Sequence, residues 1–117
     1  MTSTIHNNVS ALQAFSRQMQ VSSNNVANAL SDEFKASRAY NVEGQNGTVE
    51  TYITKTQGGA PLVEDPLKDD GSLKELSNTD IAEELVQQIA SQHGFDANAK
   101  TIQIHDETIG SLLDTIG

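Results

Sequence analysis

The second half of the chain carries one apolar stripe that is too long for a compact domain. Between residues 77 and 116, steps that alternate between four and three residues land on eleven positions, of which eight are apolar. A 3.5-residue repeat sustained over this length is typical of a helix that lies along another helix. Such a helix spans roughly 50 to 60 Å, which exceeds the diameter of a compact domain. The stripe therefore predicts a helix that is partnered along its length, by another part of the chain or by other chains.

A second stripe with the same spacing runs through residues 2–30, where six of eight positions are apolar. The only formally charged side chain up to Leu30 is Arg17, and Asn and Ser stand where a solvated helix usually carries Glu and Lys. Asn is a poor helix former. Two interpretations stay open. The segment is either a weak surface helix, or a helix contacted on several sides, where neutral amides avoid the desolvation cost of charges.

The middle of the chain follows neither stripe. A period of two appears between residues 41 and 57, and Asn46-Gly47 predicts a type I′ hairpin turn, because both central residues of that turn need a positive φ. Residues 57–76 hold both prolines and three glycines, which predicts a loop that returns the chain to the second helix. We expect Asn78 or Asp80 to cap the start of that helix, and Asp80 with Glu83 has the spacing of a capping box.

These signals predict a mainly α fold, with two long helices packed as an antiparallel coiled-coil-like hairpin and a short β-hairpin and loop between them. We expect an N-terminal helix in residues 1–40, a β-hairpin with a Pro/Gly-containing linker in 41–76, and the C-terminal helix in 77–117. Whether the first helix ends near Leu30 or continues to Arg38 stays open.

Composition and charge exclude several partners. The hydrophobic fraction of 36% is low for a compact core, which favours an elongated molecule that buries side chains along seams. The net charge of −9 lies entirely in residues 64–117, which hold twelve acids and three bases. An acidic chain is a poor partner for nucleic acid or an anionic membrane surface. There is no cysteine and no apolar run of eighteen residues, so we expect neither thiolate chemistry nor a membrane span.

The sequence gives no basis for an enzyme. His93 and His105 are twelve residues apart, which places them about 120° apart around a helix. They therefore do not converge on a metal or a substrate, and a solvated or interface role is favoured for both. No nucleophile-elbow, phosphate-cradling glycine loop or HExxH motif occurs. We expect no catalytic residue, no cofactor and no bound metal.

Both ends of the chain carry motifs that resemble the bacterial flagellar axial proteins, which are the rod, hook and hook-associated proteins. The segment SNTDIAEELVQQIASQHGFDANAKTI, followed by DETIGSLL, resembles their C-terminal helix, and ALQAFSRQMQVSSNNVANALSDEFKASRAY resembles their N-terminal motif. The T-P-G turn of the family is replaced here by Ser31-Asp32-Glu33, and its Arg-Ala-Tyr by His93-Gly94-Phe95. The short middle segment points to the small proximal-rod type.

The resemblance implies a structural component of the basal-body rod, which self-assembles through its terminal helices into the axial drive shaft. Its partners would be other copies, other rod and hook proteins, and the flagellar type III export apparatus, which exports it without a cleaved signal peptide. The family motif falls on two sets of residues, which are Ser23, Asn24, Asn25, Val26, Ala27 and Asn28 in the first helix and Ser77, Asn78, Asp80, Glu83, Glu84, Asn98, Ala99 and Lys100 in the C-terminal segment. The expected assembly and helix-packing residues are Ile5, Val9, Leu12, Met19, Asn24, Asn25, Val26, Ala27, Asn28, Ile81, Leu85, Ile89, Phe95, Asn98, Ala99, Ile102, Ile109 and Leu113.

A rival hypothesis is a helical binding module that does not polymerise, such as an export adaptor or chaperone. Such a module would be a stable dimer at every concentration, whereas a rod subunit would associate further as its concentration rises. An enzyme would instead need a deep cleft that gathers a histidine with carboxylates. Light scattering against concentration separates the first two hypotheses.

Overall fold

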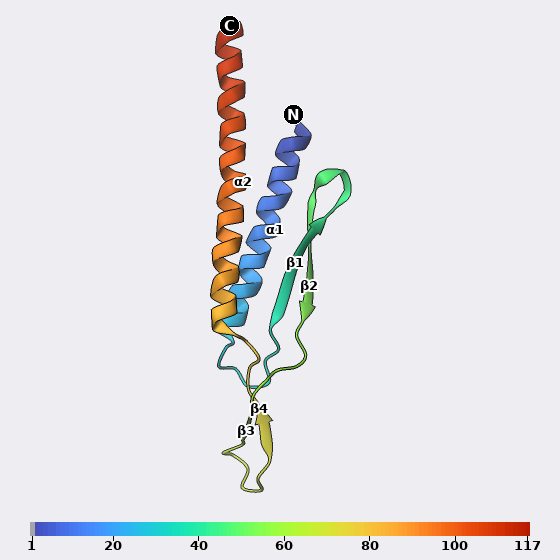
Figure 1. Cartoon of the computed structure of the whole chain (residues 1–117), viewed down its shortest axis with the longest axis vertical. Coiled ribbons are helices and arrows are strands. Elements are labelled where there is room, and N and C mark those ends of the chain that lie inside the picture. The colour runs from blue at the N-terminus through green and yellow to red at the C-terminus, as the bar shows by residue number, and fades with distance from the viewer. Residues whose placement is uncertain (1) are drawn as a thin grey trace.

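The chain folds into an elongated body. The computed structural model describes the backbone of residues 2–117 and the side chains of residues 4–117, and its principal extents are 81 × 24 × 16 Å (Figure 1). Two helices and two small antiparallel hairpins make up the fold. In chain order these elements are α1 (Thr2–Ala27), β1 (Ser37–Glu43), β2 (Val49–Lys55), β3 (Leu62–Glu64), β4 (Leu73–Glu75) and α2 (Ile81–Ile116).

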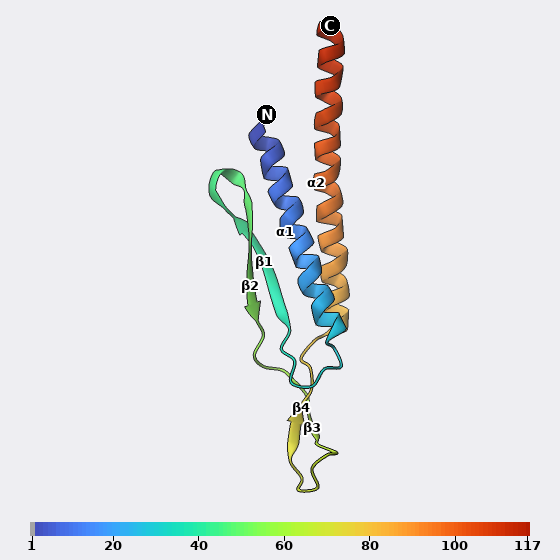
Figure 2. The ribbon, with the colours of Figure 1, turned by 180° about the vertical axis from the view of Figure 1, so that it is seen from behind.

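The two helices lie antiparallel, with the N-terminal end of α2 beside the C-terminal end of α1. Ser22, near the end of α1, reaches Glu84 near the start of α2, whereas Phe15, earlier in α1, meets Gly94, later in α2. The helix α2 continues past the beginning of α1 (Figures 1 and 2), and residues 110–117 are all exposed. We call residues 110–116 the overhang.

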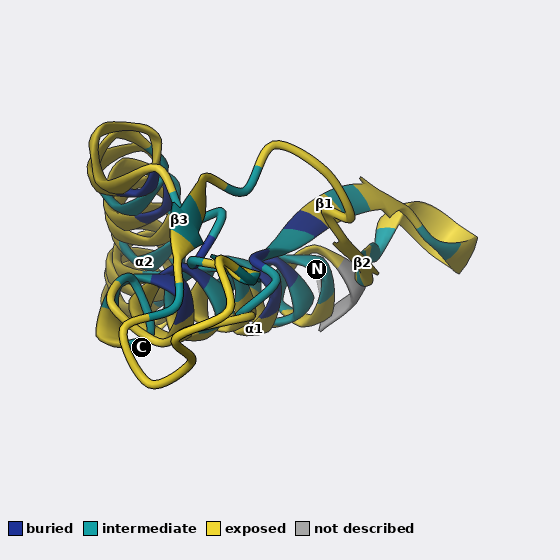
Figure 3. Ribbon diagram, turned by 90° about the horizontal axis from the view of Figure 1, so that it is seen from below, coloured by how far each residue is buried: buried dark blue, intermediate teal, exposed yellow. Residues whose placement is uncertain are grey.

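The first helix is contacted on two sides, by α2 and by the β1–β2 hairpin. Seen along the long axis, the buried residues gather where α1 lies between these two elements (Figure 3). Within the described chain the fully buried apolar residues are four alanines, Ala11 and Ala14 on α1 and Ala36 and Ala39 at β1. This arrangement favours the second interpretation of the Asn-rich helix, because its polar side chains have partners on both flanks.

The Asn46-Gly47 turn is confirmed. Asn46 has φ 58° and Gly47 has φ 79°, and the amide of Thr48 donates to the carbonyl of Gln45 over 3.2 Å. These are the positive φ values that a type I′ turn requires at its central residues. The strands pair antiparallel from Ser37 with Lys55 to Glu43 with Val49. The first strand therefore begins at Ser37, inside the range 1–40 that we expected to be helical.

The first helix ends at Ala27, near the first of the two ends that the sequence left open, because the residues after Ala27 form turns. Asn28 donates from Nδ2 to the carbonyl of Asn24 over 3.0 Å, and Ser31 donates from Oγ to Oδ1 of Asn28 over 3.0 Å. Glu33 then adopts φ 61°, a left-handed conformation that glycine adopts at little cost.

The linker between the hairpin and α2 contains a second hairpin that the sequence did not predict. Strands β3 and β4 pair from Leu62 with Glu75 to Glu64 with Leu73. Three-residue strands are too short to show a period of two, so the Pro and Gly signals dominated the prediction. In this hairpin the Ser72 hydroxyl donates to Asp70 and lowers the pKa of that carboxyl. The Asp32 carboxylate raises the pKa of Lys74, whose Nζ lies 2.9 Å away.

Candidate assembly surface

The face of α2 that packs against α1 carries polar side chains. Its closest positions recur every seven residues, where Glu84 and Ser91 are buried and Asn98 and His105 are half-buried. Ser22 donates from Oγ to the backbone carbonyl of Glu84 over 3.0 Å, and Ser91 donates to Oε1 of Gln18 over 3.3 Å. We call this contact the polar seam, and hydrogen bonds rather than aliphatic packing define its register.

A buried polar cluster lies at the end of the polar seam where α1 ends and α2 begins. Asn25 is fully buried; it donates from Nδ2 to Oε1 of Glu84 over 3.1 Å and to the carbonyl of Ser37 over 2.7 Å. Its Oδ1 accepts from the amide of Ser37 over 2.9 Å. Nη2 of Arg38 lies 3.2 Å from the same Oε1 of Glu84 and 2.9 Å from Oε1 of Glu83. One asparagine and one carboxylate thus join α1, β1 and α2.

Asn78 fastens the chain segments that converge just before α2. Its Oδ1 accepts from the amide of Ala36 over 2.6 Å, and its Nδ2 donates to the carbonyls of Thr56 and Gly58 over 2.7 and 3.1 Å. The helix then begins after Asp80, whose carboxylate accepts from the amide of Glu83 over 3.2 Å. The predicted N-cap at Asp80 is therefore confirmed.

Gly94 is required by close approach rather than by a bend. A Cβ placed at Gly94 would lie 2.5 Å from two ring carbons of Phe15 on α1. Contacts that short are not tolerated without movement of one partner. Gly110 differs, because a Cβ there would meet nothing within 4 Å. The two glycines inside α2 therefore have different roles, and only Gly94 belongs to the polar seam.

The side of α2 next to the polar seam exposes large aliphatic side chains. Ile81, Leu85 and Ile89 follow one another at four-residue spacing, and each is 49 to 58% exposed, while the neighbouring Val86 is 63% exposed. We call these four residues the aliphatic stripe. Further along, Leu112, Leu113 and Ile116 of the overhang are 51, 64 and 83% exposed. These exposed aliphatic side chains make this side of α2 a candidate interaction site.

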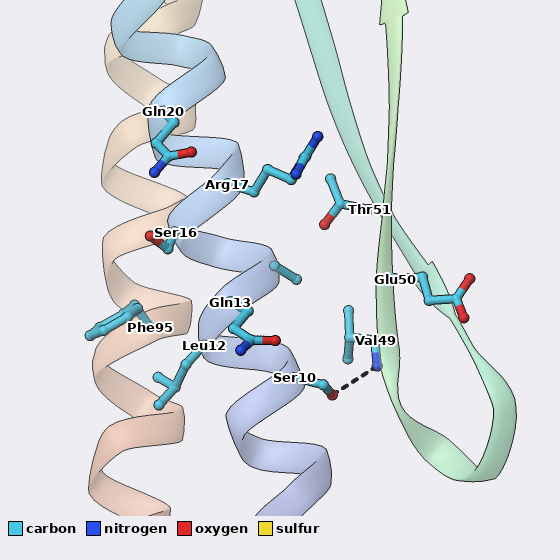
Figure 4. A pocket seen from close by; sticks show the side chains of 11 residues that line it. Ser10, Leu12, Gln13, Ser16, Arg17, Gln20, Val49, Glu50, Thr51 and Phe95 are labelled. Carbon is cyan, nitrogen blue, oxygen red and sulfur yellow. Dashed lines mark hydrogen bonds between the residues drawn. The ribbon is translucent and has the colours of Figure 1, made fainter.

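The outward side of α1 is neutral and borders two open grooves. The groove between α1 and α2 has a volume of about 750 Å³, and Phe15, Met19 and Phe95 line it. A second groove of about 850 Å³ lies between α1 and β2, where Ser10 accepts from the amide of Val49 over 3.0 Å (Figure 4). Gln20 and Ser16 line both grooves. The grooves are open hollows on the surface of the body, not closed cavities.

The expected assembly residues divide among buried, half-buried and exposed positions. Asn25 alone is buried. The half-buried members of the set are Ile5, Leu12, Met19, Val26, Asn28, Asn98, Ala99, Ile102 and Ile109, and the exposed members are Val9, Asn24, Ala27, Ile81, Leu85, Ile89, Phe95 and Leu113. The set did not include Ser22, Arg38, Glu84, Ser91 and Gly94. Three of the missing residues share a sequence signal. Glu84, Ser91 and Gly94 are polar or small, and each stands one position before a step of the 3.5-residue repeat.

Neither a metal centre nor a membrane span emerges from the described part of the chain. No three His, Asp or Glu side chains within residues 4–117 gather as metal ligands. His93 is exposed and His105 is half-buried on a different turn of α2. Neither described helix combines the length and the apolar character needed to cross a bilayer.

The comparison with known families rests on the C-terminal part of the chain. The family described as flagellar basal body rod FlgEFG protein C-terminal matches residues 70–115. This range contains β4, Asn78 and nearly all of α2, and so it includes the aliphatic stripe and the α2 side of the polar seam. No curated protein matches the chain. Residues 70–115 are therefore similar to the C-terminal part of the flagellar basal-body rod proteins, and this similarity covers less than half of the chain.

Proposed function

We propose that this chain is a subunit of the basal-body rod that self-assembles through α1 and α2 into the axial drive shaft. The observation that carries the proposal is the aliphatic stripe. Four large aliphatic residues stay half-exposed or more while polar residues occupy the intramolecular contact. A helix that buries its polar flank internally and exposes its apolar flank is suited to bury that flank in an assembly.

The two helices pair in the manner of an antiparallel coiled coil in this proposal. The recurrence of Glu84, Ser91, Asn98 and His105 every seven residues supports it, because a heptad keeps one side of a helix against its partner. Other rod and hook proteins would share the helix faces that bind further copies. Delivery by the flagellar type III apparatus without signal cleavage is part of the proposal and rests on the family resemblance alone.

Measuring the degree of assembly as a function of protein concentration tests this function. We expect the light-scattering mass of the wild-type protein to rise with concentration without a plateau, and electron microscopy to show elongated polymers. Leu85→Gln should raise the concentration needed for assembly by roughly tenfold or more, because burial of a leucine contributes about 1.5–3 kcal/mol. Leu67→Gln is the matched control, since Leu67 is 93% exposed in the β3–β4 loop, away from α2.

A plateau at the mass of a dimer would contradict polymerisation and favour a helical binding module or export adaptor. Equal effects of Leu85→Gln and Leu67→Gln would show that the aliphatic stripe is not the surface that associates.

A further inference from the structure

The two helices differ in charge on the surfaces that remain free. Between its ends α1 carries one charged side chain, Arg17, and no acid. In contrast, α2 carries six acids and one lysine, so its net charge is −5. Two α2 helices brought together would therefore oppose like charges, whereas α1 offers α2 a neutral to slightly positive surface. Like charges placed face to face in an interface cost several kcal/mol.

The aliphatic stripe itself holds no charge. Glu83 and Glu84 interrupt the sequence of the stripe, but both carboxylates are within 3.2 Å of Arg38 on the inner side. The stripe itself is apolar, and the Glu83 carboxylate beside it, which is 55% exposed, keeps the surrounding surface acidic. The outward side of α1 offers exposed Ser16, Gln20 and Ser23 beside the groove that contains the Phe15 ring.

We propose that the aliphatic stripe of one copy docks on the outward side of α1 in a second copy, along the α1 edge of the groove at Phe15 and Met19 and away from its α2 edge, which holds Asp96. The inference rests on the proposed function and names the two surfaces that meet. The contact joins different patches of the two copies, so each docked copy still presents a free α1 surface and a free stripe. Contacts of this heterologous kind extend into open assemblies rather than closing as a dimer.

Substitutions of opposite charge at Gln20 test the docking, because they should change the assembly concentration in different ways. Gln20→Glu places a negative charge opposite an acidic helix, and Gln20→Lys places a positive one there. We expect Gln20→Glu to raise the assembly concentration roughly tenfold and Gln20→Lys to leave it unchanged or lower it. Thr54→Glu and Thr54→Lys are the matched controls, because Thr54 is exposed on β2 and each pair changes the net charge equally.

The absence of native cysteine permits a second, direct test. Separate Gln20→Cys and Leu85→Cys variants are mixed and oxidised under assembly conditions. We expect dimers that join the two variants to dominate. Dimers of Leu85→Cys with itself would show that two α2 helices meet, and this result overturns the docking.

The failure of this inference is distinguishable from failure of the proposed function. If the wild type assembles while the Gln20 and Thr54 pairs behave alike, the docking is wrong and polymerisation stands. If the wild type remains a monomer at every concentration, both proposals fail.

Discussion

The two flanks of α2 reverse the usual arrangement of an amphipathic helix. On the inner flank Glu84 is 1% exposed and Ser91 is 2% exposed, whereas on the outer flank Leu85 and Ile89 are 50 and 58% exposed. A helix of a globular protein normally turns its apolar stripe to the core. The difference shows that the internal contact of this chain fixes geometry through hydrogen bonds and small residues. The apolar surface that would supply most of the binding free energy remains available on the outside.

This division leaves the single chain with little hydrophobic stabilisation. The fully buried apolar residues of the described chain are alanines, and an alanine side chain contributes little apolar area. Full burial of one aliphatic side chain contributes about 1.5–3 kcal/mol, and α2 keeps several such side chains half-exposed. The isolated chain is therefore expected to be marginally stable, and association should add to its stability.

The largest effect is expected from the inner flank. Glu84→Ala removes the carboxylate that Asn25 and Arg38 both contact, and it should lower the free energy of unfolding by about 3 kcal/mol because it leaves buried donors unpaired. Urea unfolding followed by helical circular dichroism of dilute protein measures this. Glu83→Ala is the control, since Glu83 pairs with the same Arg38 but is about half-exposed, and a change of about 0–1 kcal/mol is expected. Equal losses of unfolding free energy for Glu84→Ala and Glu83→Ala would show that the buried carboxylate has no special role on the inner flank.

Close packing at the polar seam should give the next largest effect. Gly94→Ala places a Cβ where the Phe15 ring lies, and it should destabilise the monomer by roughly 1–3 kcal/mol because the ring must move. The double variant Gly94→Ala with Phe15→Leu should recover part of the loss, which a double-mutant cycle measures. Full additivity of the two substitutions would show that the ring and the glycine do not share one contact.

A glycine-to-alanine substitution in the overhang should raise stability, whereas the same substitution at Gly94 should lower it. Gly110→Ala meets no atom within 4 Å, so only helix propensity changes, and stability should rise by up to about 1 kcal/mol. Amide hydrogen exchange of residues 108–116 in the dilute protein reports it as slower exchange. A loss of protection would mean that the overhang already packs against something in the monomer.

The smallest effect on the monomer is expected from the outer flank. Leu85→Gln keeps a good helix former at a half-exposed position, so the unfolding free energy of dilute protein should change by at most about 0.5 kcal/mol. Ala14→Gln, at a position 4% exposed, is the contrast and should cost roughly 1–3 kcal/mol by overpacking. A large loss for Leu85→Gln in dilute protein would mean that the aliphatic stripe stabilises the single chain.

Local patterns in the sequence predicted the elements whose causes are local. The Asn46-Gly47 turn follows from the φ values these residues adopt at low cost, and the start of α2 follows from the Asp80 carboxylate that caps it. The second hairpin was not predictable in this way, because strands of three residues carry no period. The end of α1 was left open between Leu30 and Arg38, because its position at Ala27 depends on a turn closed by Asn28, Ser31 and Glu33.

The sequence by itself determined that two long heptad-patterned segments would form helices, and that the net acidic charge would lie in residues 64–117. Only the tertiary structure decided which flank of each helix faces its partner. The apolar stripe predicts a buried flank in general, but Gly94 admits the Phe15 ring and Asn25 binds Glu84 and Ser37 together. These contacts join residues about 60 to 80 positions apart or on three different elements, and a heptad count does not contain them. The helices therefore meet through the polar seam, and the aliphatic stripe faces outward.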